Sequence, residues 1–281
     1  MSNKHLNKAK KLKNDEFYTQ ISDIEKELPY YKEQFKNKIV YCNCDSEFSN
    51  FWLYFKENFD NLKLKKLIIT HKHGNYKIEL TKKGIVKSLL SQNGDFRSPD
   101  CIDLLNKADI ICTNPPFSLL IEYVDLLVKY NKKFLIIFPF LSCIDKNIFN
   151  LMKDDKIWLG YQFIKEFLQE DGTIKKFGNI HWFTNFDVKK RNEFLDLRFK
   201  SYEQNPELYP KYDNYNAINI NKVKDIPGDY NGAIGVPITF LEYYNPKQFE
   251  IIKFRKGDDN KDLMINKKCP YFRIIIQKIN K

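Results

Sequence analysis

Four residues that could take part in a reaction follow one apolar run. They are Asn114, Pro115, Pro116 and Phe117, directly after Ile110–Thr113. The run is typical of a buried strand in a parallel sheet, and the two prolines end it because they cannot continue a ladder. The Asn114 side-chain oxygen and the Pro115 carbonyl can accept the two hydrogens of an amino group conjugated to a planar ring. Phe117 can stack on that ring. The arrangement suits methyl transfer to a ring amino group, with a plain Asn-Pro turn as the alternative.

The elements expected around this loop are buried strands alternating with helices. Residues 38–45 and 133–139 are apolar runs of strand length, and residues 51–59 and 118–130 carry apolar side chains at helical spacing. This order predicts an α/β fold with right-handed parallel crossovers. Asn114 then lies at a strand's carboxyl end, where open α/β sheets bind ligands. Further strands are expected at residues 65–70, 76–80, 156–159, 178–185 and 271–279, and residues 85–90 are ambiguous.

The turn after the first strand is polar but lacks the glycines expected of a nucleotide-binding unit. Asp45, Ser46 and Ser49 precede the helix there, and with exposed backbone amides they could hold a ligand. An ordinary polar turn is the alternative. The second strand ends in residues 70–73, Thr-His-Lys-His, where an acid usually binds ribose hydroxyls. We interpret these histidines as loop residues rather than metal ligands.

The composition favours a polyanionic partner. The chain has 281 residues, enough for one large or two modest domains, and its 47 Lys plus Arg against 36 Asp plus Glu give a net charge of +11. Only five of these cations are Arg, and Lys, Asn, Ile, Phe and Tyr are all frequent. An AT-rich genome imposes that pattern on any protein, so the basicity supports nucleic acid without proving it.

Several classes of protein are disfavoured. No apolar run approaches the roughly 20 residues of a membrane span, and the Lys-rich N-terminus has no apolar segment after it, so we expect neither a membrane anchor nor a secretory signal. The six cysteines include no Cys-x-x-Cys pair and no zinc-like histidine spacing. Reduced thiols in a cytosolic protein are therefore expected rather than a metal site.

The composition changes after about residue 187. A basic run, Lys189, Lys190 and Arg191, is followed by a stretch rich in Tyr, Asn and Pro, where little regular structure is expected. We therefore divide the chain into residues 1–187 and residues 188–281. The basic run is expected to contact the phosphate groups of a polyanionic partner.

Four segments together resemble a known family. Residues 114–117, Asn-Pro-Pro-Phe, match the catalytic motif of amino-group DNA methyltransferases. In order along the chain, residues 15–20, 178–185 and 235–240 look like segments of the EcoRI-type adenine-specific methyltransferases. The resemblance runs from about residue 15 to residue 276, nearly the whole chain. Some RNA and protein methyltransferases share the Asn-Pro-Pro-Phe pattern, but the four segments together are far more specific.

The resemblance implies an S-adenosylmethionine-dependent, Rossmann-like methyltransferase fold. Its sheet would be mixed, mostly parallel and flanked by helices. Residues 1–187 would form the cofactor-binding and catalytic domain, and residues 188–281 would form the C-terminal target-recognition region. The implied activity is sequence-specific methylation of the exocyclic amino group of adenine in double-stranded DNA, by base flipping, in a restriction-modification or phage-related setting. The enzyme would act as a monomer on DNA, without a metal or a membrane, in the cytoplasm of a bacterial or phage-infected cell.

The same resemblance implies roles for particular residues. Asn114 to Phe117 would receive the target adenine, and Trp182 or Phe183 would take the opposite face of that base. The residues expected to bind the cofactor are Tyr18 and Thr19 near its methionine end, Asn43, Asp45 and Ser49 at the first-strand turn, and Asp95 and Phe96 at its adenine.

Two departures from the family pattern and two competing interpretations remain. The first-strand turn has no Gly-rich signature, and the missing ribose-binding acid would be replaced by Glu47 or a water. An RNA guanine or protein glutamine methyltransferase could use the same loop, but those families lack the late segments. A non-catalytic DNA-binding relative is the other alternative, and the intact Asn114 loop argues against it.

Overall fold

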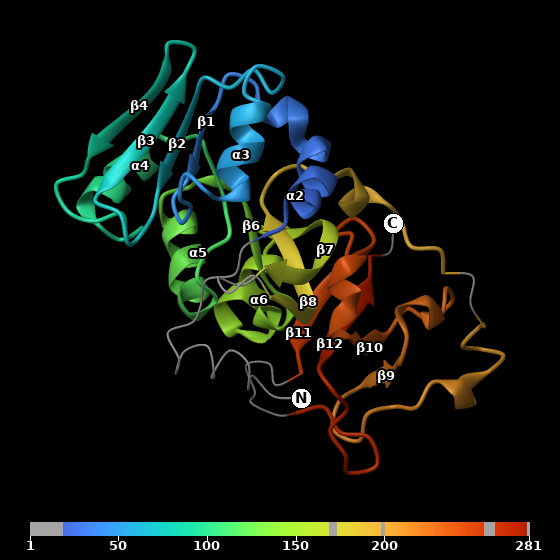
Figure 1. The fold of residues 1–281 in the computed structure, drawn as a ribbon. Helices are drawn as coiled ribbons and strands as arrows, with labels where there is room; N and C mark the ends of the chain where they lie inside the picture. The colour runs from blue at the N-terminus through green and yellow to red at the C-terminus, as the bar shows by residue number, and fades with distance from the viewer. Residues whose placement is uncertain (1–18, 169–172, 198–199, 256–261, 280–281) are drawn as a thin grey trace. The chain divides into compact units, whose positions relative to one another are not determined.

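The chain forms two compact units in a computed structural model (Figure 1). The first unit comprises Met1–Cys143 and Ile157–Asp187, and the second comprises Ile144–Lys156 and Val188–Lys281. The chain thus enters the second unit briefly for residues 144–156, returns, and enters it again at residue 188. The residues that the structure describes are 19–168, 173–197, 200–255 and 262–279.

The first unit is built on an eight-stranded sheet with the order β4-β3-β2-β1-β5-β6-β8-β7. The central strands β2, β1, β5 and β6 pair in parallel, and antiparallel pairs extend the sheet at both sides. The expected α/β fold with a mixed sheet is confirmed, and its parallel part is confined to the centre. The strands are β1 (Ile39–Cys42), β2 (Lys66–Thr70), β3 (Tyr76–Thr81), β4 (Gly84–Leu89), β5 (Ile110–Thr113), β6 (Lys133–Pro139), β7 (Trp158–Leu168) and β8 (Ile174–Thr184).

The strand order reverses between β1 and β5. Val40 of β1 lies opposite Leu67 of β2 on one side and Ile110 of β5 on the other. From β1 the chain passes to β2, and from β5 it passes the opposite way to β6. Right-handed crossovers therefore put the connecting helices α3 (Asn50–Glu57) and α5 (Leu120–Lys129) on opposite faces. The carboxyl ends of β1 and β5 flank a topological switch point, the usual ligand site of such sheets.

Serine side chains cap two helices of the first unit. Ser49 caps α3, because its hydroxyl accepts a hydrogen bond from the Trp52 amide (3.1 Å), and Ser98 caps α4 in the same way through the Cys101 amide (3.3 Å). The helices are α2 (Ile21–Glu27), α3 (Asn50–Glu57), α4 (Pro99–Lys107) and α5 (Leu120–Lys129), with 3₁₀ turns η1 (Leu28–Phe35), η2 (Phe117–Leu119) and η3 (Phe140–Ile144).

The second unit contains a four-stranded sheet with the order β11-β12-β10-β9. Tyr212, Ala217, Leu263 and Ile275 form a buried cluster in this unit. Helix α6 (Lys146–Lys153) belongs to it, and Phe149 of this helix packs on Phe254, with ring centroids 5.3 Å apart. The remaining elements are β9 (Ala217–Asn219), β10 (Ala233–Pro237), β11 (Phe249–Phe254), β12 (Arg273–Lys278), η4 (Lys189–Asn192), η5 (Pro206–Leu208), η6 (Val223–Asp225) and η7 (Ile238–Glu242).

The observed elements extend the expected ones in three places. Residues 85–89 of the ambiguous stretch 85–90 belong to strand β4, and helix α4 was not expected. The strands expected at 156–159 and 178–185 are longer and pair as the hairpin β7–β8. No helix within the described part of the chain is long and apolar enough to cross a membrane.

Candidate active site

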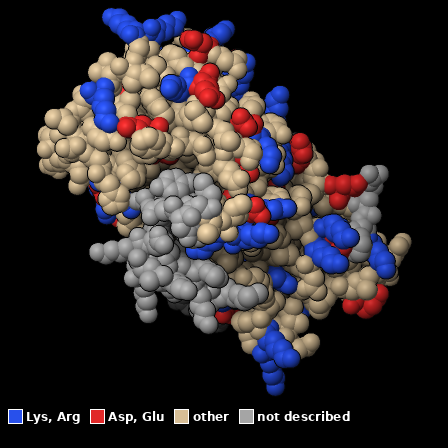
Figure 2. All heavy atoms as spheres, in the orientation of Figure 1, with Lys and Arg blue, Asp and Glu red and all other residues tan. Residues whose placement is uncertain are grey.

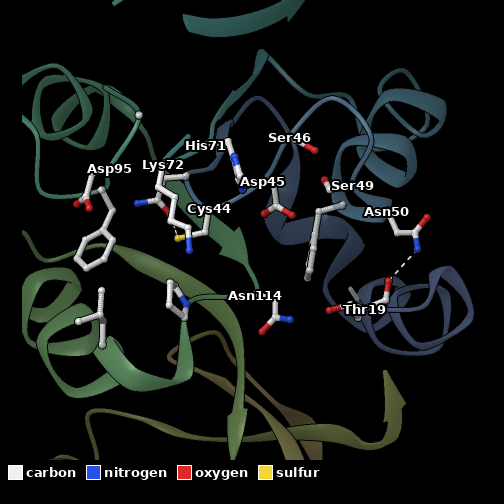
Figure 3. A pocket seen from close by; sticks show the side chains of 16 residues that line it. Thr19, Cys44, Asp45, Ser46, Ser49, Asn50, His71, Lys72, Asp95 and Asn114 are labelled. Carbon is white, nitrogen blue, oxygen red and sulfur yellow. Dashed lines mark hydrogen bonds between the residues drawn. The ribbon is translucent and has the colours of Figure 1, made fainter. Parts of the chain in front are cut away.

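A cavity lies at the carboxyl ends of β1, β2 and β5, where the topology predicts a crevice. It is partly open to solvent, and its walls come from the turns after these strands, the turn before α4 and the segment before α2 (Figure 3). Nine of the residues expected to bind a ligand or to react line it. They are Thr19, Asn43, Asp45, Ser46, Ser49, Asp95, Phe96, Asn114 and Pro116.

Asp45 is the buried acid of this cavity. Its backbone amide donates to the Thr70 carbonyl at the end of β2 (3.1 Å), and the Thr113 hydroxyl at the end of β5 donates to its carboxylate. Burial raises the pKa of Asp45 to about 7, with smaller opposing effects from hydrogen bonds with Thr113 and Ser49. The side chain therefore changes charge close to neutral pH.

Two buried polar atoms in the cavity wall have no hydrogen-bond partner among the described residues. They are the Thr19 hydroxyl oxygen and the Asn43 amide nitrogen, on side chains that are 4% and 1% exposed. Asn50 fixes the segment of Thr19 by donating to its carbonyl oxygen (2.8 Å; Figure 3). An unsatisfied buried polar group costs about 1–3 kcal/mol. A ligand that supplied the missing bonds would remove that cost.

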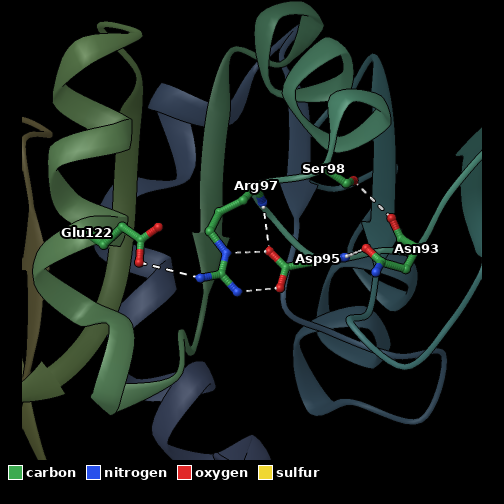
Figure 4. Close-up of polar contacts among 5 residues, drawn as sticks. All are labelled: Asn93, Asp95, Arg97, Ser98 and Glu122. Carbon is green, nitrogen blue, oxygen red and sulfur yellow. Dashed lines mark hydrogen bonds and ion pairs between the residues drawn. The ribbon is translucent and has the colours of Figure 1, made fainter.

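Asp95 is held in place by a two-point contact with Arg97 (Figure 4). Arg97 Nε lies 2.8 Å from Oδ1 and Nη2 lies 2.7 Å from Oδ2, while Nη1 lies 3.5 Å from the Glu122 carboxylate on α5. The hydrogen bonds from Arg97 hold the pKa of Asp95 below its ordinary value, so this carboxylate is ionised at neutral pH. The neighbouring Phe96 is buried and lines the cavity.

The loop after β5 brings only part of its motif to the cavity. Asn114 and Pro116 line the cavity, whereas Pro115 is buried outside the lining. The Leu119 amide donates to the Pro116 carbonyl (3.0 Å) and closes the turn η2. Phe117 is 6% exposed, and its ring lies edge-on to Phe167 of β7, 6.2 Å between centroids. Asn114 is thus the motif's polar side chain at the cavity.

Trp182 and Phe183 lie in the core and do not line the cavity. Both are fully buried, because β8 is an interior strand of the sheet and its two faces are covered. The Phe183 ring stacks on Phe138 with 3.5 Å between centroids, and the Trp182 ring meets Phe51 edge-on at 5.9 Å. Phe51 does line the cavity, so Trp182 supports the cavity wall from behind.

The basic run belongs to the second unit and forms η4. Lys189 is exposed and Lys190 is half-buried, while Arg191 forms an ion pair with Asp155 of the same unit. Desolvation lowers the pKa of Arg191. Tyr18, the remaining expected cofactor residue, lies outside the described residues.

Several lining residues were not expected from the sequence. His71 and Lys72 follow β2 and line the cavity, where the family pattern has an acid. Glu47, the expected substitute for that acid, is absent from the lining and forms an ion pair with Lys87 (3.0 Å). His71 and Lys72 could have been predicted as lining residues from the sequence, because they directly follow a central buried strand. The other additional residues are Cys44, Asn50, Phe51, Gly94 and Leu119.

The described residues contain no cluster of potential metal ligands, since no three of their His, Cys, Asp or Glu side chains come together as a metal site would require. The six cysteines are free thiols, and four of them are buried. Burial raises the pKa of the Cys42, Cys112 and Cys143 thiols, so these thiols are neutral at physiological pH.

An Asn-Pro-Pro-Phe loop beside a cavity at the switch point of a mixed α/β sheet defines a methyltransferase of the amino-group class. The sequence model of the family "Adenine-specific methyltransferase EcoRI" matches residues 5–84 and 72–279. The chain belongs to this family.

Three curated relatives are similar over most of their length. The chain is 51% identical to the Type II methyltransferase M.EcoRI of Escherichia coli, covering 98% of this chain and 97% of the relative. It is 38% identical to the Type II methyltransferase M.MgeORF184P of Mycoplasma genitalium, covering 98% of each. It is 40% identical to the Type II methyltransferase M.MpnI of Mycoplasma pneumoniae, covering 88% of this chain and 85% of the relative. No solved structure gives a significant match.

Proposed function

We propose that this protein transfers a methyl group from S-adenosylmethionine to the exocyclic amino group of adenine at a specific sequence in double-stranded DNA. One observation carries the proposal. Asn114 and the buried acid Asp45 line the same cavity, and Thr113 joins the two by its hydrogen bond to Asp45 and its peptide bond to Asn114. A group that would accept the amine's hydrogens therefore lies beside carboxylates that would bind a cationic ligand.

The cavity suits S-adenosylmethionine in its donor set. Asp45 and Asp95 would attract the cation, and the unpaired atoms of Thr19 and Asn43 would bind the polar ends. The bound cofactor would supply an electrophilic methyl group on a sulfonium. His71 and Lys72, rather than an acid, would border the ribose.

Asn114 would activate the target amine. The exocyclic amine of adenine is a poor nucleophile because its lone pair is conjugated with the ring. Acceptance of its hydrogens by the Asn114 side-chain oxygen and the Pro115 carbonyl would localise that lone pair towards the methyl group. The stiff Pro115-Pro116 segment would hold these acceptors in place, so no reorganisation would be needed as charge develops.

The adenine must leave the duplex to reach this loop. Phe117 follows the cavity-lining Pro116, and we propose that it stacks on one face of the flipped base. The sequence suggests Trp182 or Phe183 for the other face. Because both rings are buried, we propose that they support the site from the core. Phe51, which packs on Trp182, is the ring that lines the cavity. The second unit, with Lys189 and Lys190, would bind the flanking duplex, and the protein would act as a monomer.

The direct test is a methylation assay on purified components. The wild-type protein, S-adenosylmethionine with a labelled methyl group and plasmid DNA are incubated, and the DNA is digested to nucleosides. The expected product is N6-methyl-2′-deoxyadenosine. When the methylated positions are mapped on the plasmid, they should all lie in one short sequence. No label in DNA, with label in RNA or protein offered as substrates in separate reactions, would overturn the proposal. The Asn114→Ala variant is the matched control for contaminating activity.

A further inference from the structure

Tyr123 connects the helix after the catalytic loop with two walls of the cavity. It lies in α5, four residues after Leu119, and it is fully buried. Its hydroxyl donates to the Asn43 side-chain oxygen, and its ring meets the Phe96 ring edge-on, with 5.0 Å between centroids. Tyr123 itself does not line the cavity, while Asn43 and Phe96 both do. It therefore touches the site only through other residues.

The surroundings of Asn43 determine which way its amide faces. The Asn43 oxygen receives the Tyr123 hydroxyl and also lies 3.9 Å from the Cys44 thiol, so two donors converge on it. Burial raises the pKa of Tyr123 and of Cys44 well above their ordinary values, so both keep their protons at neutral pH. An amide with its oxygen so occupied has only its nitrogen left to offer. That nitrogen is the buried Nδ2 with no partner among the described residues.

We propose that Tyr123 is a positioning residue, which fixes the Asn43 amide as a hydrogen-bond donor to the cofactor and supports Phe96 from behind. This inference rests on the proposed function, since it assigns the cavity to the cofactor. It adds a requirement on the ligand, because the group that meets Asn43 must be an acceptor, such as the cofactor's carboxylate or a ring nitrogen.

The contribution of the hydroxyl is measurable with Tyr123→Phe, which keeps the ring against Phe96. Without the hydroxyl, the Asn43 amide loses its preferred orientation and part of its donor role. We expect the dissociation constant of S-adenosylhomocysteine, measured by calorimetry, to rise by about tenfold, the range of one hydrogen bond. In turnover the KM for the cofactor should rise, and kcat at saturating cofactor should stay within about twofold, because Asn114 is untouched.

Tyr41→Phe is the matched control. Tyr41 is equally buried, and its hydroxyl bonds to Thr70 at 2.7 Å, but neither residue lines the cavity. Both variants remove one buried hydroxyl, so both should lose a comparable amount of thermal stability. Only Tyr123→Phe should weaken S-adenosylhomocysteine binding. Equal shifts in affinity for the two variants, or no shift for either, would overturn the positioning role.

A second pair of variants separates the proposed route from general damage. In the Asn43→Ala background, adding Tyr123→Phe should change the affinity by less than about twofold, because its effect passes through Asn43. Asn43→Asp keeps the acceptor for Tyr123 and replaces the donor, so it should bind S-adenosylhomocysteine at least about tenfold more weakly. Wild-type affinity in Asn43→Asp, or full additivity of the double variant, contradicts the inference. Failure of the proposed function is distinguishable, since the wild type would then bind no S-adenosylhomocysteine.

Discussion

The Thr113 hydroxyl donates a hydrogen bond to the Asp45 carboxylate, across two adjacent parallel strands. Thr113 ends β5 and immediately precedes Asn114, while Asp45 lies in the turn after β1. Thr113 is fully buried, so this bond is shielded from water. Any movement of the loop after β5 relative to Asp45 must therefore disturb this contact.

Asn114→Ala should abolish most turnover and leave ligand binding nearly intact. The side-chain oxygen acts on the amine as it reacts, so its loss should reduce kcat by about 10²–10³-fold, as for other preorganised polar groups. Labelled methyl transfer to DNA measures the rate, and calorimetry with S-adenosylhomocysteine measures binding. Turnover close to that of wild type would disprove the role of Asn114.

Asp45 should make cofactor affinity depend on pH near neutrality. Its pKa is raised by burial to about 7, so it is mostly neutral at pH 6 and mostly ionised at pH 8. The ionised form attracts the cationic cofactor, and affinity should increase by up to about tenfold per pH unit below that pKa. Asp45→Asn should weaken binding at pH 8 and remove the dependence. Asp95→Asn is the control, because the pKa of Asp95 is lowered and this group stays ionised throughout the range.

The same substitution has a predicted effect on stability, with a definite sign. A buried carboxyl whose folded pKa is raised is more stable protonated, so its stabilising contribution is complete below its unfolded pKa and is lost as pH rises towards 7. Asp45→Asn removes that loss. At pH 8 we expect its Tm to exceed that of wild type by several degrees, at about 2–4 °C per kcal/mol for a chain of this size. An equal or lower Tm at pH 8 would contradict the buried, ionised state of Asp45.

The sequence predicts the centre of the first sheet well, because its strands are continuous apolar runs. The limits of β7 are harder to predict. Tyr161 and Gln162 donate their backbone amides to the buried Glu27 carboxylate at 2.8 and 2.7 Å, and the pairing of β7 with β8 shifts register there. A Cβ on Gly160 would lie 2.2 Å from that carboxylate. A bulge maintained by a residue more than 130 positions away leaves no local pattern.

The same limitation applies to the candidate site. Asn114 and Asp45 follow apolar strands, so their position could be predicted from the order of the strands. The position of His71 depends on a contact with a residue distant in the sequence, Gly94. A Cβ on Gly94 would lie 2.2 Å from the His71 carbonyl oxygen. Gly94 also donates its amide to Gly74 (2.7 Å). Only the folded chain reveals this close packing, which makes glycine necessary at position 94.

Removal of metal should leave the activity unchanged. The described residues contain no cluster of three potential metal ligands, and the proposed transfer uses hydrogen bonds and carboxylates. Methylation rates measured with and without an excess of chelator should agree within experimental error. Loss of activity in chelator that is restored by zinc would instead support a metal site formed by the cysteines and histidines.

Lys189 and Lys190 should contribute to salt-dependent DNA binding. Each phosphate contact changes the slope of log K against log salt by about 0.9, so Lys189→Gln with Lys190→Gln should flatten it by about one to two units. Affinity for S-adenosylhomocysteine should not change. Arg191→Gln is the contrasting variant, because Arg191 is paired with Asp155 and should affect thermal stability more than the slope. An unchanged slope in the double variant would show that Lys189 and Lys190 are solvated surface residues that do not contact DNA phosphate.

Base extrusion should be detectable with a fluorescent adenine analogue at the target position. The analogue is quenched while stacked in duplex DNA, so enzyme binding should brighten it as it leaves its neighbours. Extrusion costs a few kcal/mol, and stacking on an aromatic ring returns about 1–3 kcal/mol per base. Phe117→Ala should therefore reduce the signal. A mismatch opposite the target should tighten binding to wild type, because the lost base pair no longer resists extrusion. Binding that is indifferent to the mismatch, with an analogue that stays dark in both proteins, would show that the adenine is not flipped into the pocket proposed here.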